Sequence, residues 1–463
     1  MAAADASAHA IEATVLERLR PEPALLDRLA EVRALLVERG TALAKARDFP
    51  LVRCLVAGSA ARGTFLRDRL DLDFFLLFPP TVSRADLERM GLELGAALLT
   101  APETRYAEHP YRRGTFEGFT VDAVPGYAIE DPSHPLTAVD RTPFHQAYLA
   151  ERETPALVDQ IRLAKQFLRA LGVYGSEARR GGCSGYLVEL LVLRFGSLRA
   201  LLAEARSWRI PVRLPTRPTA APRVPDDVAL VLDDPVDPNR NVATALTRRN
   251  LGLFILAAAE YLDRPRASAF ELRTDPGIPR ARGVALVESR GTHVTGVRLP
   301  RPALVDDILY PQLRKAERSI AEEIARLGFR VVGSAAAAGD GELVILVEVE
   351  SAHRPVVDPR DGPPPGIDRV GDFLAKWTAA DAPVLQGPFV AADGRLAVEA
   401  RRAERRLEPL LTAALPRLPL GRDLTPGEGA VPLGSLNDSA PLREALRELL
   451  GKHLPWLPDA ATG

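Results

Sequence analysis

The chain has 463 residues, of which 46% are hydrophobic and 26% are charged, and its formal net charge is −1. This length exceeds one ordinary core and predicts two to four domains of globular composition. No apolar run approaches the ~20 residues that a membrane-spanning helix needs, and the N-terminus lacks the basic start and apolar core of a secretory signal. We therefore expect a folded protein with no membrane segment.

The two cysteines, Cys54 and Cys183, provide neither a disulfide framework nor a thiolate metal cluster. A reducing, cytoplasmic setting is the expectation that follows. The near-zero net charge gives no global argument for nucleic-acid binding, because phosphate binding depends on where the positive charges lie.

The first part of the chain predicts two helices and then a sheet. Residues 11–40 carry apolar residues at helical spacing, interrupted by Pro21 and Pro23 and closed by Gly40. From 51 to 125, three apolar and β-rich runs predict strands, namely LVRCLVAG, LDLDFFLLF and GFTVDAVPGY. The stretch SRADLERMGLELGAALL predicts a helix between the second and third strands, so this part is an α/β unit with a central sheet.

Helices dominate from about 154 to 262, in the segments TPALVDQIRLAKQFLRALG, SGYLVELLVLRFGSLRALLAEARSW and NVATALTRRNLGLFILAAAEYLD. The Pro-rich segment IPVRLPTRPTAAPRVP predicts a surface loop, and a domain boundary is expected near 265–280. Beyond it, GVALVES and GELVILVEVES predict strands that flank a helix from about Leu304 to Leu327. The turn ADGR at 392–395 predicts a hairpin between GPFV and LAVEA.

Two aspartates, Asp71 and Asp73, stand in an apolar run that otherwise predicts a buried strand. Side chains alternate along a strand, so both carboxylates point to one face. Neighbouring carboxylates repel and lose hydration on a partly buried face, which is costly unless cations lie between them. Mg²⁺ prefers carboxylate oxygens, and Asp122 in a second predicted strand supplies a third acid for a two-metal site. The alternative is a strand end whose aspartates meet solvent.

A Gly-Ser turn precedes the aspartates. Gly58 and Ser59 end a predicted strand, and the following AARGTFL can begin a helix whose free N–H groups suit a phosphate. Arg62, one turn further, adds a cation that can bind a phosphate in bidentate fashion. An ordinary turn is the alternative for each feature alone. The order of turn, serine, arginine, aspartate pair and distant aspartate favours a two-metal phosphoryl-transfer site over the plainer alternatives.

This combination resembles the signature of the DNA polymerase β nucleotidyltransferase superfamily. Four further segments resemble the archaeal, class I CCA-adding enzyme, a tRNA nucleotidyltransferase: VDRTPFH (139–145), KQFLRALGVYGSE (165–177), GGCSGYLVELLVL (181–193) and DPVDPNRNVA (234–243). The PWLP near the C-terminus is also similar to that family. The resemblance covers essentially the whole chain and is weakest in its C-terminal half.

The resemblance implies an α+β, multi-domain fold. We expect a nucleotidyltransferase palm with a mixed β-sheet in 1–150, a helical neck that completes the nucleotide pocket in 151–268, and an α+β, tRNA-binding body and tail in 269–463. It also implies template-independent addition of CCA to the tRNA 3′ end from CTP and ATP, with two Mg²⁺ ions and release of pyrophosphate. Members of the family often form homodimers, but no dimer interface can be identified in this sequence.

The resemblance assigns the catalytic and metal-binding roles to Asp71, Asp73 and Asp122. The first of these carboxylates can be Glu in the family, so Asp71 has a shorter reach. The implied nucleotide-binding residues are Gly58, Ser59, Arg62, Thr142, His145, Lys165, Tyr174 and Arg240.

Several of these residues have plainer alternatives when each is considered alone. His145 could be a structural hydrogen-bonding residue, and Lys165 an exposed helix lysine. Tyr174 could cap a helix, and Arg240 could be a surface charge. By resemblance, His145, Lys165 and Tyr174 contact the triphosphate and sugar region, and Arg240 faces the base.

One apparent motif is not a catalytic one. GGCSGY does not match the hydrolase pattern G-x-S-x-G, because Tyr186 occupies the last position. Ser184 is better interpreted as the N-cap of the following helix.

Two basic clusters, LRKAER (313–318) and RRAERR (401–406), lie on predicted helices. Solvated helix faces are one interpretation, since acids are interleaved. Under the family reading, such modules hold the tRNA acceptor stem through phosphate and 2′-hydroxyl contacts. Two alternative functions stay open: another terminal transferase such as a poly(A) polymerase, and a non-catalytic RNA-binding protein on the same scaffold.

Overall fold

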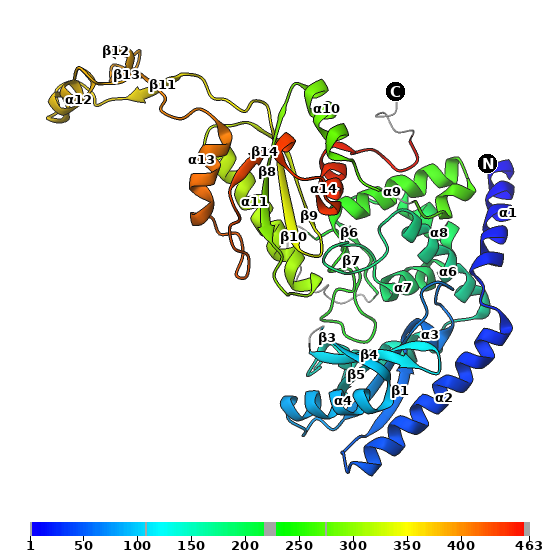
Figure 1. The fold of residues 1–463 in the computed structure, drawn as a ribbon. Coiled ribbons are helices and arrows are strands. Elements are labelled where there is room, and N and C mark those ends of the chain that lie inside the picture. The colour runs from blue at the N-terminus through cyan, green and yellow to red at the C-terminus, as the bar shows by residue number, and fades with distance from the viewer. Residues whose placement is uncertain (1, 107–108, 217–227, 274–275, 458–463) are drawn as a thin grey trace. The chain divides into compact units, whose positions relative to one another are not determined.

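The computed structural model describes residues 2–106, 109–216, 228–273 and 276–457. The chain divides into two compact units, Met1–Thr274 and Asp275–Gly463 (Figure 1). Because residues before 275 form one unit, the expected division near residue 150 stays a prediction. Within the described ranges, no helix is long and apolar enough to cross a membrane.

A five-stranded mixed sheet forms the base of the first unit. Its strands are β1 (Arg53–Ala57), β2 (Asp71–Phe78), β3 (Thr100–Tyr106), β4 (Pro110–Phe116) and β5 (Phe119–Tyr127), in the order β1-β2-β5-β4-β3. The β2–β5 pair is parallel, and the other pairs are antiparallel. The three strands predicted from the sequence are confirmed. The strands β3 and β4 were not predicted, because their TAPETRY and PYRRGTF are mostly polar.

The two faces of β2 pack in two different hydrophobic clusters. The helices α2 (Pro23–Ala46) and α4 (Arg84–Leu98) pack on one face, where Phe74, Leu76 and Phe78 belong to the main core. Phe75 and Leu77 point to the opposite face and join a smaller cluster with Ala57. Since side chains alternate, Asp71 and Asp73 lie on the face of the smaller cluster, away from α2 and α4.

The predicted end of α2 at Gly40 is wrong. The helix continues through Gly40 to Ala46, and glycine is needed there for packing. A Cβ at Gly40 would lie 2.7 Å from Cζ of Phe74, which is fully buried.

The rest of the first unit is mainly helical, as predicted. It contains α1 (Ala2–Leu19), α3 (Gly58–Arg62), η1 (Ala138–Arg141), α5 (Thr142–Ala150), α6 (Pro155–Ala170), α7 (Gly185–Phe195), α8 (Leu198–Ala205), β6 (Val212–Arg213), β7 (Leu230–Val231), α9 (Arg248–Asp263) and η2 (Ala267–Phe270). The segment SGYLVELLVLRFGSLRALLAEARSW forms two helices, α7 and α8. Gly196 ends α7 in the left-handed region at φ 85°, and Ser197 caps α8. Much of the predicted Pro-rich loop, 217–227, lies outside the described residues.

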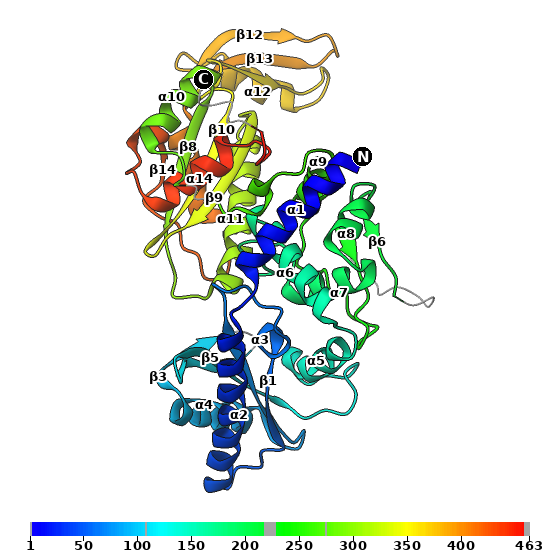
Figure 2. The ribbon, with the colours of Figure 1, turned by 90° about the vertical axis from the view of Figure 1, so that its right-hand side faces the viewer.

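The second unit contains two antiparallel sheets (Figure 2). The larger consists of β8 (His293–Pro300), β9 (Val331–Ala338), β10 (Glu342–Val349) and β14 (Ala430–Pro432); the smaller consists of β11 (Val357–Asp361), β12 (Val384–Val390) and β13 (Leu396–Arg401). The helical elements are α10 (Arg280–Arg290), α11 (Asp306–Arg326), α12 (Arg369–Trp377), α13 (Leu407–Ala414), η3 (Leu415–Arg417), η4 (Leu433–Ser435) and α14 (Ala440–Leu450). The expected hairpin is confirmed by the β12–β13 pairing.

Two predictions for the second unit are wrong. GVALVES lies in helix α10 rather than in a strand, and Val287 packs in a core that α14 also lines. A short apolar run does not distinguish a strand from a buried helix. The cluster at 401–406 begins at the end of β13 and precedes α13, so it is not helical. The cluster at 313–318 lies on α11 as predicted.

Candidate active site

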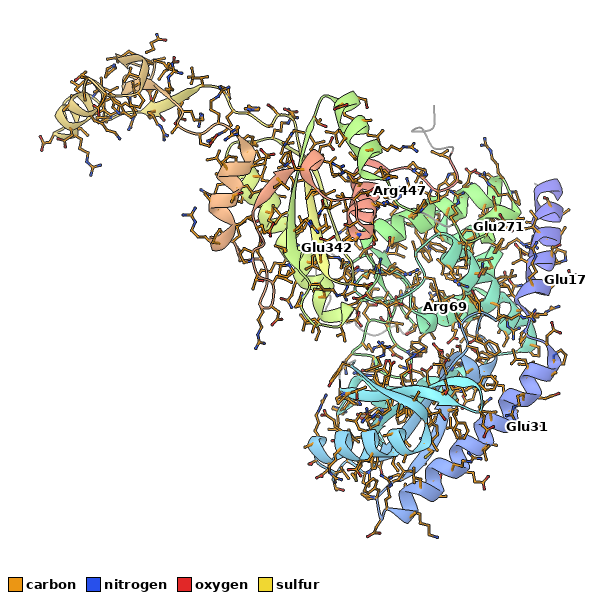
Figure 3. The ribbon with its side chains drawn as sticks, in the orientation of Figure 1. Glu17, Glu31, Arg69, Glu271, Glu342 and Arg447 are labelled. Atoms are coloured by element: carbon orange, nitrogen blue, oxygen red, sulfur yellow. The ribbon has the colours of Figure 1, made fainter. Side chains whose placement is uncertain are left out.

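The three predicted catalytic aspartates come together on one face of the first sheet. Asp71 and Asp73 begin β2, and Asp122 lies on the neighbouring strand β5. In the parallel register Asp73 is the direct partner of Asp122. Arg69, which is labelled in Figure 3, lies in the loop between α3 and β2.

Negative charge is concentrated around Asp73. Burial, together with the charges of Asp122 and Asp71, raises the pKa of Asp73 to about 6. Burial also raises the pKa of Asp122. Gly58 is in direct contact, since a Cβ there would lie 2.2 Å from Oδ2 of Asp73, and its φ is +72°. Both observations restrict this position to glycine.

Arg113 on β4 bridges two of the three carboxylates. Its Nη1 lies 2.9 Å from Oδ2 of Asp122, and its Nη2 lies 3.0 Å from Oδ2 of Asp71. Among the described residues, no group of three or more His, Cys, Asp or Glu side chains is arranged to hold a metal ion. The donor chemistry nevertheless fits Mg²⁺, because three carboxylates lie on neighbouring strands and an added cation would relieve their mutual repulsion. Arg113 now supplies that positive charge.

The turn before the aspartates has the predicted form. Strand β1 ends at Ala57, and α3 begins at Gly58 with Ser59 in its first turn. Gly63, in the left-handed region at φ 73°, ends this short helix. Gly58 and Ser59 therefore lie beside the aspartates at the end of a strand.

Arg62 and Lys165 are both buried, and both pair with Glu189 of α7. Arg62 donates to Gln146 and Glu153 as well as to Glu189. Lys165 is 1% exposed, so the alternative of an exposed helix lysine is wrong. Its Nζ donates to Glu189 Oε1 at 2.8 Å, to Thr64 O at 3.0 Å and to Thr64 Oγ1 at 3.2 Å. These contacts use all three of its protons.

Tyr174 and Lys165 both approach Gly185, the first residue of α7. A Cβ on Gly185 would be 3.2 Å from the Tyr174 hydroxyl and 3.9 Å from Nζ of Lys165. Tyr174 also forms an isolated bridge with Cys183. Ser184 accepts a hydrogen bond from the backbone N–H of Leu187, so its predicted capping role is confirmed.

His145 and Arg240 meet at Asp234, whose side chain is fully buried. His145 Nε2 lies 2.8 Å from Asp234 Oδ2, and Arg240 Nη1 donates to the same oxygen at 2.7 Å. Tyr186 donates its hydroxyl to Oδ1 at 3.0 Å and stacks on the His145 ring at a centroid distance of 4.0 Å. Burial opposes ionisation of Asp234, but hydrogen bonds from His145 and other donors lower its pKa to about 2.

Thr142 is the first residue of α5, three residues before His145. It is partly buried. The structure thus places Thr142 one helical turn from the residue with which sequence reasoning associated it.

Sequence reasoning missed several polar partners of the predicted residues. These are Arg113, Gln146, Glu153, Tyr186, Glu189 and Asp234. A signal existed for Glu189, because it is an acidic residue inside the apolar run LVELLVL. Arg113 gave no signal, since it lies among other arginines on a mostly polar strand.

Three family profiles match successive parts of the chain. Residues 43–145 match a family described as a nucleotidyltransferase domain. Residues 159–271 match the second domain of tRNA nucleotidyltransferase, and residues 290–426 match the C-terminal domain of CCA-adding enzymes.

Full-length relatives show the same similarity. The CCA-adding enzyme of Haloarcula marismortui is 39% identical over 410 residues, which is 85% of this chain and 86% of the relative. That of Thermoplasma volcanium is 32% identical over 414 residues, covering 89% of this chain and 90% of the relative. Among solved structures, E. coli MS115-1 CdnC with ATP covers 57% of this chain and 94% of its own, with a TM-score of 0.45 and 20% identity.

Proposed function

This chain belongs to the archaeal CCA-adding enzyme family, and we propose from that premise that it adds C, C and A to the 3′ end of tRNA. CTP and ATP are the proposed substrates, and pyrophosphate is released at each step. The main support is that the predicted aspartates lie side by side on β2 and β5, with Gly58 against Asp73. The match over 85% of the chain supports the same reaction.

Asp71, Asp73 and Asp122 are the residues proposed to hold two Mg²⁺ ions. Bound Mg²⁺ would lower the pKa of the primer 3′-hydroxyl and neutralise triphosphate charge. Arg113 would compete with metal ions for Asp71 and Asp122, because its guanidinium donates to both carboxylates.

The remaining residues of the site bind and orient the nucleotide in this proposal. Ser59 of the α3 turn, Arg62, Lys165 and the hydroxyl of Tyr174 would orient the triphosphate. Thr142 and His145 approach from α5, and Arg240 would donate to acceptors on the cytosine or adenine base. A homodimer, which the family implies, would be tested by light scattering of the purified protein.

Product length tests the proposed reaction. The protein is incubated with Mg²⁺, labelled CTP or ATP, and tRNA that lacks its CCA end. We expect incorporation to stop after the CCA triplet. Unlimited addition of A would support a poly(A) polymerase instead, and no incorporation would support a non-catalytic RNA-binding protein.

Substitution of Asp73 tests the proposed site in the same assay. Asp73→Ala should reduce incorporation to background, because its carboxylate is central to the acidic cluster. Asp68→Ala is the matched control, since Asp68 pairs with Arg169 at the surface and is 57% exposed. Asp73→Ala with wild-type activity would contradict the catalytic assignment.

A further inference from the structure

One buried carboxylate contacts three residues beside the candidate phosphate site. Glu189 Oε1 accepts from Lys165 Nζ at 2.8 Å and from Thr64 Oγ1 at 2.6 Å, and its Oε2 accepts from Arg62. The side chains of Glu189, Arg62 and Lys165 are 3%, 7% and 1% exposed. Glu189 therefore has a donor on each oxygen and little contact with water.

The contacts of Thr64 connect this cluster to the Gly58–Ser59 turn. The backbone N–H of Thr64 donates to the carbonyl of Ser59 at 3.0 Å. The carbonyl and hydroxyl of Thr64 accept from Lys165, and its hydroxyl donates to Glu189. Thr64 is fully buried. A displacement of Glu189 would thus be transmitted through one residue to the end of the turn.

The charges in the cluster balance. Arg62 and Lys165 are the cations, and Glu189 and Glu153 are the carboxylates. Burial opposes ionisation of Glu189, but Lys165 and Arg62 outweigh it and lower its pKa. Burial raises the pKa of Glu153, although the charge of Arg62 opposes this. Glu189 therefore ionises more readily than Glu153.

We propose that Glu189 is a positioning residue that holds the Gly58–Ser59 turn and Arg62 in place for the nucleotide triphosphate. It acts through Thr64 and Lys165 rather than by touching the substrate. Lys165 connects the two residues, because its Nζ donates to Thr64 and to Glu189. The inference rests on the proposed function, since it takes a nucleotide triphosphate as the ligand of the turn.

Direct nucleotide binding tests the proposal. The dissociation constants of CTP and ATP are measured with Mg²⁺ and without tRNA, alongside KM, kcat and thermal unfolding. Glu189→Gln should raise both dissociation constants by about tenfold to a hundredfold, because a shift of about 1 Å in a binding turn has effects of that size. KM for tRNA should not change. A loss confined to thermal stability, or dissociation constants that stay equal or fall, would overturn the proposal.

Two further variants isolate the route through Thr64. Thr64→Val removes the hydroxyl and should weaken nucleotide binding by itself. Glu189→Gln combined with Thr64→Val should be no weaker than Glu189→Gln alone, because both remove the same connection. If Glu189→Gln does not fold, Thr64→Val decides alone, and wild-type nucleotide binding by that variant would overturn the proposal.

Glu153→Gln is the matched control. It removes the other carboxylate partner of Arg62 but no contact to Thr64 or Lys165, so its effect on nucleotide binding should be smaller than that of Glu189→Gln. If Glu153→Gln weakens nucleotide binding as much as Glu189→Gln, the loss comes from Arg62 alone. That result would overturn the proposal that Glu189 acts through Thr64. A wild-type protein that binds both nucleotides but does not complete CCA would overturn the proposed function and leave this inference standing.

Discussion

Asp234 and Glu189 have the same role in different parts of the candidate site. Each is a buried carboxylate that accepts from two predicted nucleotide-binding residues, His145 and Arg240 in the first case and Arg62 and Lys165 in the second. A buried carboxylate of this kind is stable only when its hydrogen bonds are satisfied. Both therefore hold their donor side chains in defined positions.

If the aspartates hold metal ions as proposed, Arg113 competes with those ions for two of the three carboxylates. Arg113→Gln should increase the affinity for Mn²⁺, because a divalent ion would no longer compete with a guanidinium that bonds Asp122 at 2.9 Å and Asp71 at 3.0 Å. The gain should be about tenfold or less, since Arg113 and Asp71 are partly exposed and exposed ion pairs are weak. Calorimetric titration with Mn²⁺, without nucleotide or tRNA, measures this affinity.

Arg105→Gln is the control for the Arg113 titration. Arg105 pairs with Glu103 and lowers the pKa of Asp122 through space, but it does not bridge the aspartates. Both variants lose one positive charge near the same carboxylates. Equal Mn²⁺ affinities in the two variants would show that general charge, and not the Arg113 bridge, governs metal binding.

At the scale of elements, packing explains why one helix contains a glycine. Gly40→Ala should destabilise the first unit by about 1 kcal/mol, because an overpacking cost of 1–3 kcal/mol against Phe74 exceeds a gain of about 1 kcal/mol in helix propensity. The added Cβ would lie 2.7 Å from a fully buried ring. Chemical denaturation followed by circular dichroism measures the free energy of unfolding.

Gly252→Ala is the matched control for Gly40→Ala. Gly252 also lies inside a helix of the first unit, α9, and a Cβ there would come no closer than 3.9 Å to Ile210. Helix propensity should therefore dominate, and this variant should be stabilised by up to about 1 kcal/mol. Stabilisation by Gly40→Ala as well would contradict the packing argument.

The elements differ in how far the sequence alone could predict them. The aspartate pair and its strand were predictable, because residues at i and i+2 share a face whatever the rest of the fold does. The end of α2 was not, since Gly40 is selected by contact with a strand that is distant in sequence. GVALVES forms a helix because it packs with α14, more than 140 residues later. The contacts of Asp234 and Glu189 likewise depend on tertiary structure.

At the scale of the whole molecule, the net charge of −1 gives no general attraction for RNA, so tRNA binding must use local positive charge. Lys315 and Arg318 are exposed on α11, while the neighbouring Leu313 and Ala316 are buried. This places both charges on the solvent face of one helix in the second unit.

If this face of α11 contacts RNA phosphates, removing its two charges should weaken tRNA binding. The same change should also reduce the salt dependence of tRNA binding. For Lys315→Gln with Arg318→Gln, we expect lower affinity and a slope of log affinity against log salt that is shallower by about 1 to 2, because each phosphate contact contributes about 0.7 to 0.9. Filter binding over a range of salt concentrations measures this slope. CTP affinity without tRNA should not change.

A control with the same loss of charge separates a local contact from general electrostatics. Arg84→Gln with Arg89→Gln removes two charges from α4 in the first unit, where Arg84 pairs with Glu88 and Arg89 pairs with Asp86 and Glu93. Because neighbouring acids already offset these arginines, their loss should leave the salt slope near that of the wild type. Equal slopes in the two double variants would mean that α11 makes no phosphate contact of its own, and tRNA would then have to bind elsewhere on the molecule.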